Sequence, residues 1–229
     1  MLAAPRYLAL EVKSLDRVRP FYETILDLPV KTDGDGELVV GVGDCELRLR
    51  TPGEVPRGGL HTHYALSVSR EAYDDWYDRL DERFDLDEHR FGDARSLYCY
   101  DPEGNCVELG ETVDEGAGIR GLFEVVLEVE DLSSAVDFYS RLGFEVVDRG
   151  GERRRVRMTT GEVDLELWEP QLGLADARGG VHVDWGIAAD DPVARSDRVA
   201  ADALAVDHFE DQSRIRDPDG HYLTLFERE

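Results

Sequence analysis

Two segments of the chain, YCYDPEGNCVEL at residues 98–109 and RIRDPDGHYLTL at residues 214–225, follow one pattern. Each predicts an extended run, an Asp-Pro-x-Gly turn and a second extended run, because Pro presets one turn dihedral and Gly tolerates another that other residues resist. The copies differ where the first has Glu108 and the second has Thr224. A repeated hairpin that has lost one carboxylate raises the question of what that carboxylate does.

The repeat extends outward from these hairpins. YLALEVKSLDRVRPFYETILDLPV, from Tyr7, matches EVVLEVEDLSSAVDFYSRLGFEV, from Glu124, at nearly the same offset of about 116 residues. Both predict an alternating strand, a Ser or Asp helix-start signal, an amphipathic helix carrying Phe-Tyr, and a further strand. The chain is therefore predicted to be a duplication.

Each half divides again, because HTHYALSVS, from His61, and VHVDWGIAA, from Val181, also predict strands followed by helical patterns. The sequence thus predicts an α+β fold of four βαβββ units. Gly-rich and Pro-containing stretches mark the junctions. We expect them near residues 52–59, 112–118 and 170–180, with the two halves at residues 1–113 and 119–229.

The charge of the chain is strongly negative. Asp and Glu total 51 against 26 Lys and Arg, which gives a formal net charge of -25. Such a surface repels nucleic acid and anionic membranes, so neither is an expected partner. It is typical of halophilic proteins, in which concentrated salt screens long-range repulsion.

Cysteine spacing and hydropathy exclude further classes. Cys45, Cys99 and Cys106 are odd in number and lack CxxC spacing, so they predict neither a disulfide framework nor a cysteine metal site. No apolar run approaches a membrane-spanning length, and no basic, apolar leader opens the sequence. We expect a cytoplasmic protein.

Four βαβββ units with a terminal Asp-Pro-x-Gly hairpin, and openings of the form x-V-x-L-x-V-x-D-L before a Phe-Tyr helix, resemble the vicinal oxygen chelate superfamily. That superfamily includes glyoxalase I, extradiol dioxygenases, and fosfomycin and bleomycin resistance proteins. The resemblance implies curved sheets that form two half-barrel pairs around a metal. It implies no single reaction, because one scaffold serves several chemistries.

Strand alternation tests this resemblance independently, since one face of each strand should be apolar and the other should face a cavity. In the strand from Glu124, Val125 and Leu127 share one face and Glu124 lies on the other. The same separation holds in three more strands. The polar residues on the face away from the helices include His63, Glu108, Glu124 and Glu166, together with His61, Ser67, Glu128 and Asp164.

By motif position, the resemblance implies two candidate ligand positions in each unit. If adjacent units share a cavity, both cavities are defective, since a guanidinium such as that of Arg48 cannot ligate a metal. Pairing of units two and three, as in fused glyoxalase-type members, concentrates the losses in one cavity, and we favour it. One cavity then holds His63, Glu108, Glu124 and Glu166, and the other holds Tyr7, Arg48, His182 and Thr224.

Three carboxylates and one imidazole within bonding distance repel one another unless a cation or protons compensate them. This set suits a six-coordinate Mn, Fe, Ni or Zn ion with open positions. The resemblance implies a glyoxalase-type lyase or isomerase, a monomer or homodimer, acting on a small-molecule substrate with vicinal oxygens through an enediolate. Glu108 or Glu166 would move the proton, with Glu108 favoured by the resemblance.

Two other functions stay open. An extradiol dioxygenase needs two histidines and one carboxylate on Fe(II), so it would have to recruit His61, which we expect at the cavity entrance. A resistance-type protein would bind a ligand without catalysis. The segment GERRRVR, residues 151–157, predicts a strand with Arg155 and Arg157 on one side. These arginines would either bind an anionic substrate group or form a solvated edge.

Overall fold

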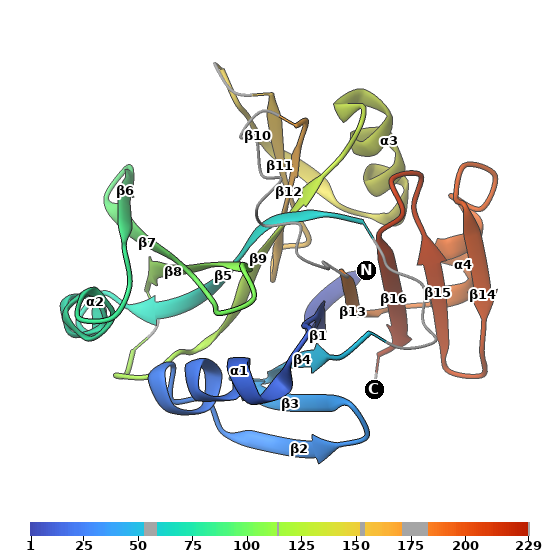
Figure 1. Ribbon diagram of the computed structural model, residues 1–229. Coiled ribbons are helices and arrows are strands. Elements are labelled where there is room, and N and C mark those ends of the chain that lie inside the picture. Colours follow the sequence, from blue (N-terminus) through green and yellow to red (C-terminus); the bar gives the residue numbers. More distant parts are fainter. Residues whose placement is uncertain (53–58, 114, 152–153, 171–182, 229) are drawn as a thin grey trace.

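The computed structural model describes residues 1–52, 59–113, 115–151, 154–170 and 183–228. Four successive βαβββ modules make up the chain, which confirms the predicted fold class (Figure 1). Module 1 contains β1 (Leu2–Glu11), α1 (Leu15–Arg19), the π-helical turn η1 (Pro20–Ile25), β2 (Val30–Gly34), β3 (Glu37–Val42) and β4 (Cys45–Arg50). Module 2 contains β5 (His61–Ser69), α2 (Tyr73–Asp81), β6 (Asp87–Phe91), β7 (Ala94–Tyr100) and β8 (Cys106–Thr112).

Modules 3 and 4 repeat this order. Module 3 contains β9 (Gly121–Glu128), α3 (Leu132–Leu142), β10 (Glu145–Arg149), β11 (Arg155–Thr159) and β12 (Asp164–Trp168). Module 4 contains β13 (Asp184–Ala189), α4 (Pro192–Asp197), β14 (Ala205–His208), β15 (Gln212–Arg216) and β16 (Tyr222–Glu227).

Local sequence signals explain where the helices begin and end, and α3 shows this clearly. The Asp131 side chain accepts a 2.7 Å hydrogen bond from the backbone N–H of Ser134, which satisfies a donor that the first helical turn leaves open. Gly143 ends α3 with a φ of 118°, in the left-handed region that a side chain disfavours.

The strands form two eight-stranded mixed sheets. In one, β1 of module 1 lies antiparallel to β13 of module 4; in the other, β5 of module 2 lies antiparallel to β9 of module 3. Modules 2 and 3 therefore share a sheet, and modules 1 and 4 share the other, as Figure 1 shows. This confirms the favoured pairing of the four units.

The Phe-Tyr helices and the Asp-Pro turns, which the sequence repeats, contact each other across the two sheets. The Tyr22 hydroxyl donates a 2.7 Å hydrogen bond to Asp101 in the turn of module 2. Tyr139 of module 3 donates a bond of the same length to Asp217 in the turn of module 4. The other oxygen of each aspartate accepts backbone N–H groups of its own turn.

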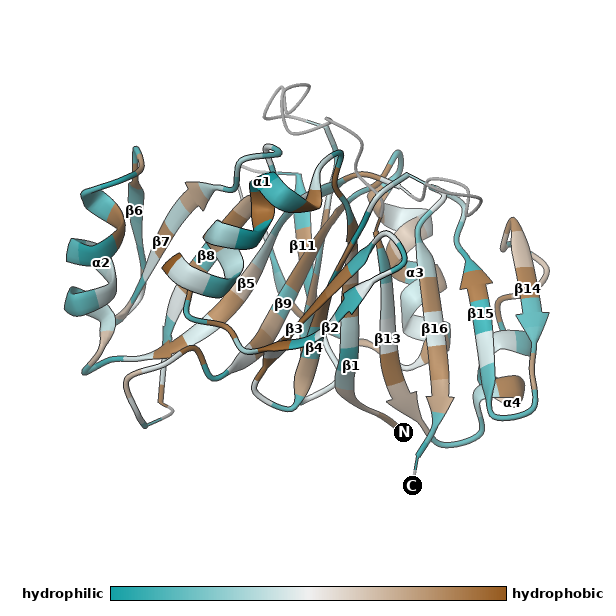
Figure 2. Cartoon of the chain, turned by 60° about the horizontal axis from the view of Figure 1, so that its bottom comes forward, coloured by the Kyte–Doolittle hydropathy of each residue, from teal (hydrophilic) through white to brown (hydrophobic). Residues whose placement is uncertain are grey.

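One apolar core runs through all four modules. It contains the predicted aliphatic faces, for example Val125 and Leu127 of β9 and Leu165 of β12, and the Phe21 and Phe138 side chains of the helices. In Figure 2 the strands accordingly alternate between hydrophobic and hydrophilic residues. In the four strands for which the sequence predicted an apolar face, β5, β8, β9 and β12, that face packs in the core, which leaves the polar face for a cavity.

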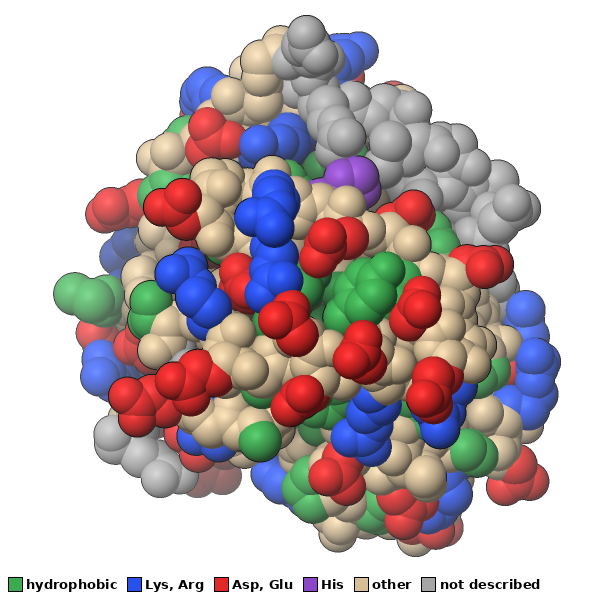
Figure 3. Space-filling model, turned by 90° about the vertical axis from the view of Figure 1, so that its left-hand side faces the viewer, with side chains coloured by type: hydrophobic (Ala, Val, Ile, Leu, Met, Phe, Trp, Pro, Cys, Tyr) green, Lys and Arg blue, Asp and Glu red, His purple; other side chains and the backbone are tan. Residues whose placement is uncertain are grey.

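The surface reflects the composition. In the described part of the face shown in Figure 3, acidic side chains are widely spread, with basic side chains between them. Within the described part of the chain, no helix has the length and apolar character needed to cross a membrane.

Candidate metal centre

The shared sheet of modules 2 and 3 brings three predicted residues together. Ala65 on β5 pairs with Glu108 on β8 at one side and with Glu124 on β9 at the other. His63 precedes Ala65 by two residues and so faces the same side of the sheet. All three polar side chains are buried at the wall of a cavity of about 430 Å³.

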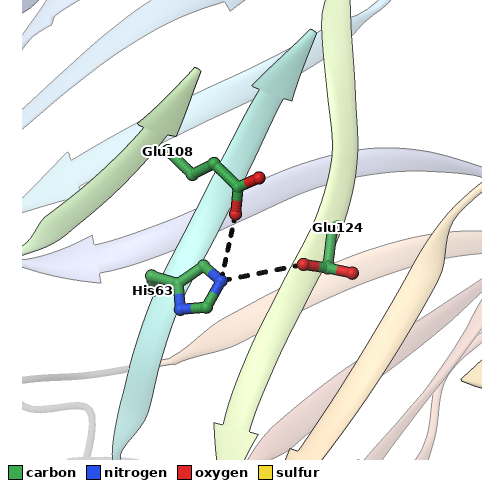
Figure 4. Close-up of side chains that lie close together, drawn as sticks. All are labelled: His63, Glu108 and Glu124. Carbon is green, nitrogen blue, oxygen red and sulfur yellow. Dashed lines mark ion pairs between the residues drawn. The ribbon is translucent and has the colours of Figure 1, made fainter. Parts of the chain in front are cut away.

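Both carboxylates point at one nitrogen of the imidazole (Figure 4). His63 Nε2 lies 3.1 Å from Glu108 Oε2 and 3.7 Å from Glu124 Oε1. One ligand atom from each residue can be chosen so that all three lie within 4.8 Å of one another. A single imidazole N–H can be directed at only one of the two carboxylate oxygens that face it, so the imidazole leaves the other oxygen without this donor.

This electrostatic imbalance shifts two pKa values. Burial alone would lower the pKa of His63, but the contacts with Glu108 and Glu124 outweigh it and raise the pKa to about 9. Burial alone would raise the pKa of Glu108, but contacts with His63, Ser96 and Tyr98 outweigh it and lower that pKa. Both shifts favour an imidazolium beside ionised carboxylates in the absence of metal, so a divalent ion bound to His63 would have to displace the proton on Nε2.

Glu124 divides its two oxygens between different partners. Oε1 faces His63, whereas Oε2 accepts a 2.7 Å hydrogen bond from Arg157 Nε and a second one from Nη2. Arg157 lies on β11, beside β12 and not beside β9, and reaches across to the carboxylate. The guanidinium therefore orients Glu124 without covering the oxygen that faces His63.

Glu166, the fourth predicted residue, lines the same cavity but lies outside the three-residue group. Its Oε1 accepts a 2.7 Å hydrogen bond from Arg155, and its Oε2 accepts a 2.6 Å bond from the Trp168 indole. Burial, followed by the charge of Glu124, raises the pKa of Glu166. Both oxygens are thus engaged, and Glu166 must turn before it can reach the other three residues.

The group of three residues fits a divalent ion. Two ligands bound about 2.1 Å from one ion lie roughly 3 to 4 Å apart, which matches the spacing around His63 Nε2. Glu108 Oε2 is fully buried, and among the described residues no hydrogen-bond donor is well aligned with it, despite its 3.1 Å distance from the imidazole. One nitrogen and two carboxylate oxygens suit Mn, Fe, Ni or Zn and leave positions open.

The sheet of modules 1 and 4 places different side chains at the equivalent positions. Tyr7 donates weak hydrogen bonds to Asp184 (3.2 Å) and Thr224 (3.3 Å), and the Arg48 guanidinium lies 4.0 Å from the centre of the Tyr7 ring. A hydroxyl and a guanidinium thus take the places of Glu124 and Glu166. Glu46 accepts hydrogen bonds from Arg48 at 2.8 and 3.1 Å, so this cationic group is already paired.

The strand register corrects one predicted position. Gly186 pairs with Thr224 as Ala65 pairs with Glu108, so the equivalent of His63 is Asp184. Motif position alone implies His182, which lies outside the described residues. His182 precedes Gly186 by four residues, as His61 precedes Ala65, so it corresponds to His61 and not to His63.

His61 does not occupy the expected position at the cavity entrance. Its side chain is buried, it is absent from the described cavity lining, and a register shift separates it from His63. Burial lowers its pKa to about 3, with smaller contributions from His63 and His221. Among the described residues, the candidate metal centre therefore has one histidine.

Fold and site together define a class: a tandem protein of four βαβββ modules with one candidate metal centre and one cavity of altered chemistry. The family model of the Glyoxalase/Bleomycin resistance protein/Dioxygenase superfamily matches residues 5–109 and again residues 121–225. Because the two matches together span most of the sequence, the chain belongs to this superfamily, as the sequence motifs indicated.

Known proteins agree with this assignment. Metallothiol transferase FosB from Lysinibacillus sphaericus is 26% identical over 110 residues, which is 45% of this chain and 78% of that protein. FosB from Staphylococcus epidermidis is 24% identical over 116 residues, 48% of this chain and 84% of its own length. Glyoxalase I from Zea mays superposes with a TM-score of 0.73 at 16% identity, over 98% of this chain and 92% of that chain. At this identity the structural likeness shows the fold alone.

Proposed function

We propose that the protein is a metal-dependent enzyme of the glyoxalase type, a lyase or isomerase that acts on a small molecule with two adjacent oxygens through an enediolate. The observation that carries this proposal is the convergence of Glu108 and Glu124 on one nitrogen of His63 in a cavity of about 430 Å³. This volume lies in the range of sites that bind small molecules.

His63, Glu108 and Glu124 would hold the ion. A divalent ion bound there would polarise two neighbouring substrate oxygens and stabilise the negative charge that develops on them. Arg157 holds the far oxygen of Glu124 and so fixes the direction of the carboxylate. Tyr98 and Ser96 do the same for Glu108.

Glu166 is the better placed of the two proposed proton carriers. It lines the cavity, and Arg155 and Trp168 keep it apart from the three-residue group. Glu108, which the family resemblance favoured, is a member of that group, so it would have to leave the ion to take a proton. In this proposal, Glu166 can become a fourth ligand of the ion only if its side chain rotates and breaks its hydrogen bonds with Arg155 and Trp168.

The two alternative functions, ring cleavage by a dioxygenase and metal-free ligand binding, have less support. Ring cleavage of a catechol would use two histidines, and the described part of the centre offers His63 alone. The FosB relatives are named metallothiol transferases, but their match extends over about half of this chain, so it supports the use of a metal more than thiol transfer. Measurement of the metal content distinguishes a metal-free ligand-binding protein from the proposed enzyme.

Metal content tests the proposal directly. The protein, purified in high salt and dialysed against Mn²⁺ or Zn²⁺, should retain about one ion per chain by mass spectrometry of the metal. His63→Ala and Glu108→Gln should lose the ion. Thr224→Val, the matched change at the equivalent of Glu108 in the other cavity, should retain it. Absence of bound metal from the unsubstituted protein would contradict the proposal and favour the metal-free binder.

A further inference from the structure

We infer that Arg157, with Arg155 beside it, forms an anion-binding subsite next to the metal centre, and that the substrate therefore carries a carboxylate as well as two adjacent oxygens. This inference rests on the proposed function, because it places the anion beside an ion held by His63, Glu108 and Glu124.

Arg157 lines the cavity, and one nitrogen of its guanidinium has no partner among the described residues. Nε and Nη2 bind Glu124, and Nε also lies 3.3 Å from Asp164. Among the described residues, Nη1 has no hydrogen-bond or ion-pair partner. About a third of the Arg157 side chain (35%) is exposed, although the carboxylate that it holds is buried. A guanidinium fixed on one edge and open on the other suits a carboxylate of a ligand.

Arg155 extends the same positive strip. It alternates with the core residue Val156 on β11, so both arginines project from one face of the strand into the cavity. Arg155 holds Glu166 through Nη1 and lies 2.9 Å from Asp148 through Nη2. The alternative that these arginines form a solvated edge does not fit their contacts with buried carboxylates.

The charge of the cavity makes anion binding dependent on metal. Even with Glu111 paired to Arg95, the remaining carboxylates outnumber the two arginines, so an anion is repelled from the metal-free cavity. A divalent ion cancels this excess of two negative charges and places a positive charge beside the subsite. By linkage, an anionic ligand that needs the ion must also tighten the binding of the ion. The carboxylates in the described lining are Asp87, Glu108, Glu111, Glu124 and Glu166.

The geometry limits the size of the substrate. Glu124 faces His63 through one oxygen and Arg157 through the other, so the centre and the subsite are one carboxylate apart. A compact molecule can therefore place two adjacent oxygens at the ion and its own carboxylate at Arg157. The probe 3,4-dihydroxybenzoate has this arrangement, and 3,4-dihydroxybenzamide has the same shape without the charge.

Calorimetry with these two probes, without oxygen and with Zn²⁺ as a redox-inert ion, tests the inference. The Zn²⁺-loaded protein should bind the benzoate on the order of 10- to 100-fold more tightly than the benzamide, as expected for a charged hydrogen bond. The metal-free protein should bind the benzoate at least tenfold more weakly than the loaded protein.

Arg157→Gln, measured at saturating Zn²⁺ because the same guanidinium orients Glu124, should lose the preference for the benzoate over the benzamide. The matched control is Arg214→Gln, because Arg214 lies opposite Thr224 on β15 and β16 as Arg157 lies opposite Glu166 on β11 and β12. It should change neither affinity. The comparison of the two probes in the unsubstituted protein needs no variant, so it stands even if Arg157→Gln fails to fold.

Equal affinities of the Zn²⁺-loaded protein for the two probes would overturn the anion subsite and leave the proposed metal centre intact. Equally tight binding of the benzoate without metal would overturn the dependence on metal. Failure to bind Zn²⁺ at all would overturn the proposed function and this inference together.

Discussion

At the scale of single residues, the different surroundings of Glu108 and Thr224 explain why the two repeated hairpins differ at this position. Glu108 faces the imidazole of His63, whereas Thr224 at the equivalent position accepts a hydrogen bond from Tyr7. A carboxylate suits the proposed metal centre, and a neutral hydroxyl suffices where Tyr7 and Asp184 form hydrogen-bonded contacts with no proposed ion. The four equivalent pairs are His63 and Asp184, Glu108 and Thr224, Glu124 and Tyr7, and Glu166 and Arg48.

Replacing Glu124 by Gln should lower the affinity for Mn²⁺ about tenfold or more, because the change keeps the shape of a proposed ligand but removes its charge. Tyr7→Phe is the matched change in the other cavity and should have no effect on Mn²⁺ binding. Titration followed by electron paramagnetic resonance of free Mn²⁺ measures both affinities. Unchanged affinity in Glu124→Gln would remove Glu124 from the proposed ligands.

The three cysteines should be inert in the native protein. Burial raises the pKa of Cys45, Cys99 and Cys106 to about 12, and all three are free and buried. Because a raised pKa leaves little thiolate, a thiol-alkylating reagent at pH 8 should modify none of them until denaturant is added. Mass spectrometry counts the adducts, and rapid labelling of the folded protein would contradict the buried placement.

Strand alternation explains both the correct and the incorrect predictions of residue positions. Alternation with a period of two assigns His63, Glu108 and Glu124 to one face, which the structure bears out. A shift by two residues keeps a strand on the same face, so alternation cannot distinguish His182 from Asp184. Only the observed pairing of Gly186 with Thr224 resolves that choice.

At the scale of elements, the repeated motifs join helices to turns. Tyr22 and Tyr139, the tyrosines of the two Phe-Tyr motifs, are both buried in the core. Their hydroxyl groups also bind the aspartates of the Asp-Pro turns, a role that the sequence could not reveal, because the partners belong to different modules. These hydrogen bonds tie one sheet to the other.

Tyr139→Phe should therefore destabilise the protein by about 1–3 kcal/mol, since it leaves one buried oxygen of Asp217 without its donor. Chemical denaturation followed by circular dichroism measures the free energy of unfolding. Tyr77→Phe on α2 is the control, because no hydrogen bond of the Tyr77 hydroxyl occurs among the described residues. Equal stability of the two variants would show that the bond between Tyr139 and Asp217 contributes little.

At the scale of the whole molecule, pairing of the modules places the candidate centre between residues far apart in sequence. The duplication allowed the four units to be compared, and pairing units two and three placed all the positions without a metal-ligating side chain in one cavity. That argument predicted the pairing. The contacts of Arg155 and Arg157 with Glu166 and Glu124 were beyond prediction, since long side chains on one strand reach neighbours on others in ways that alternation does not specify.

The net charge of -25 predicts that salt stabilises the fold. Repulsion among surface carboxylates weakens as the Debye length falls from about 10 Å at 0.1 M salt to about 3 Å at 1 M. The melting temperature should rise with added KCl, most steeply at low concentration, by roughly 2–4 °C for each kcal/mol gained. A melting temperature that stays constant between 0.1 M and 1 M KCl would contradict this expectation.

The most direct test of the account is crystallography of the Mn²⁺-loaded protein with anomalous diffraction from the metal. We predict one strong anomalous peak per chain, at about 2.0–2.3 Å from His63 Nε2 and from one oxygen each of Glu108 and Glu124. A peak beside Tyr7 and Asp184 instead, or no peak in the cavity of modules 2 and 3, would contradict it.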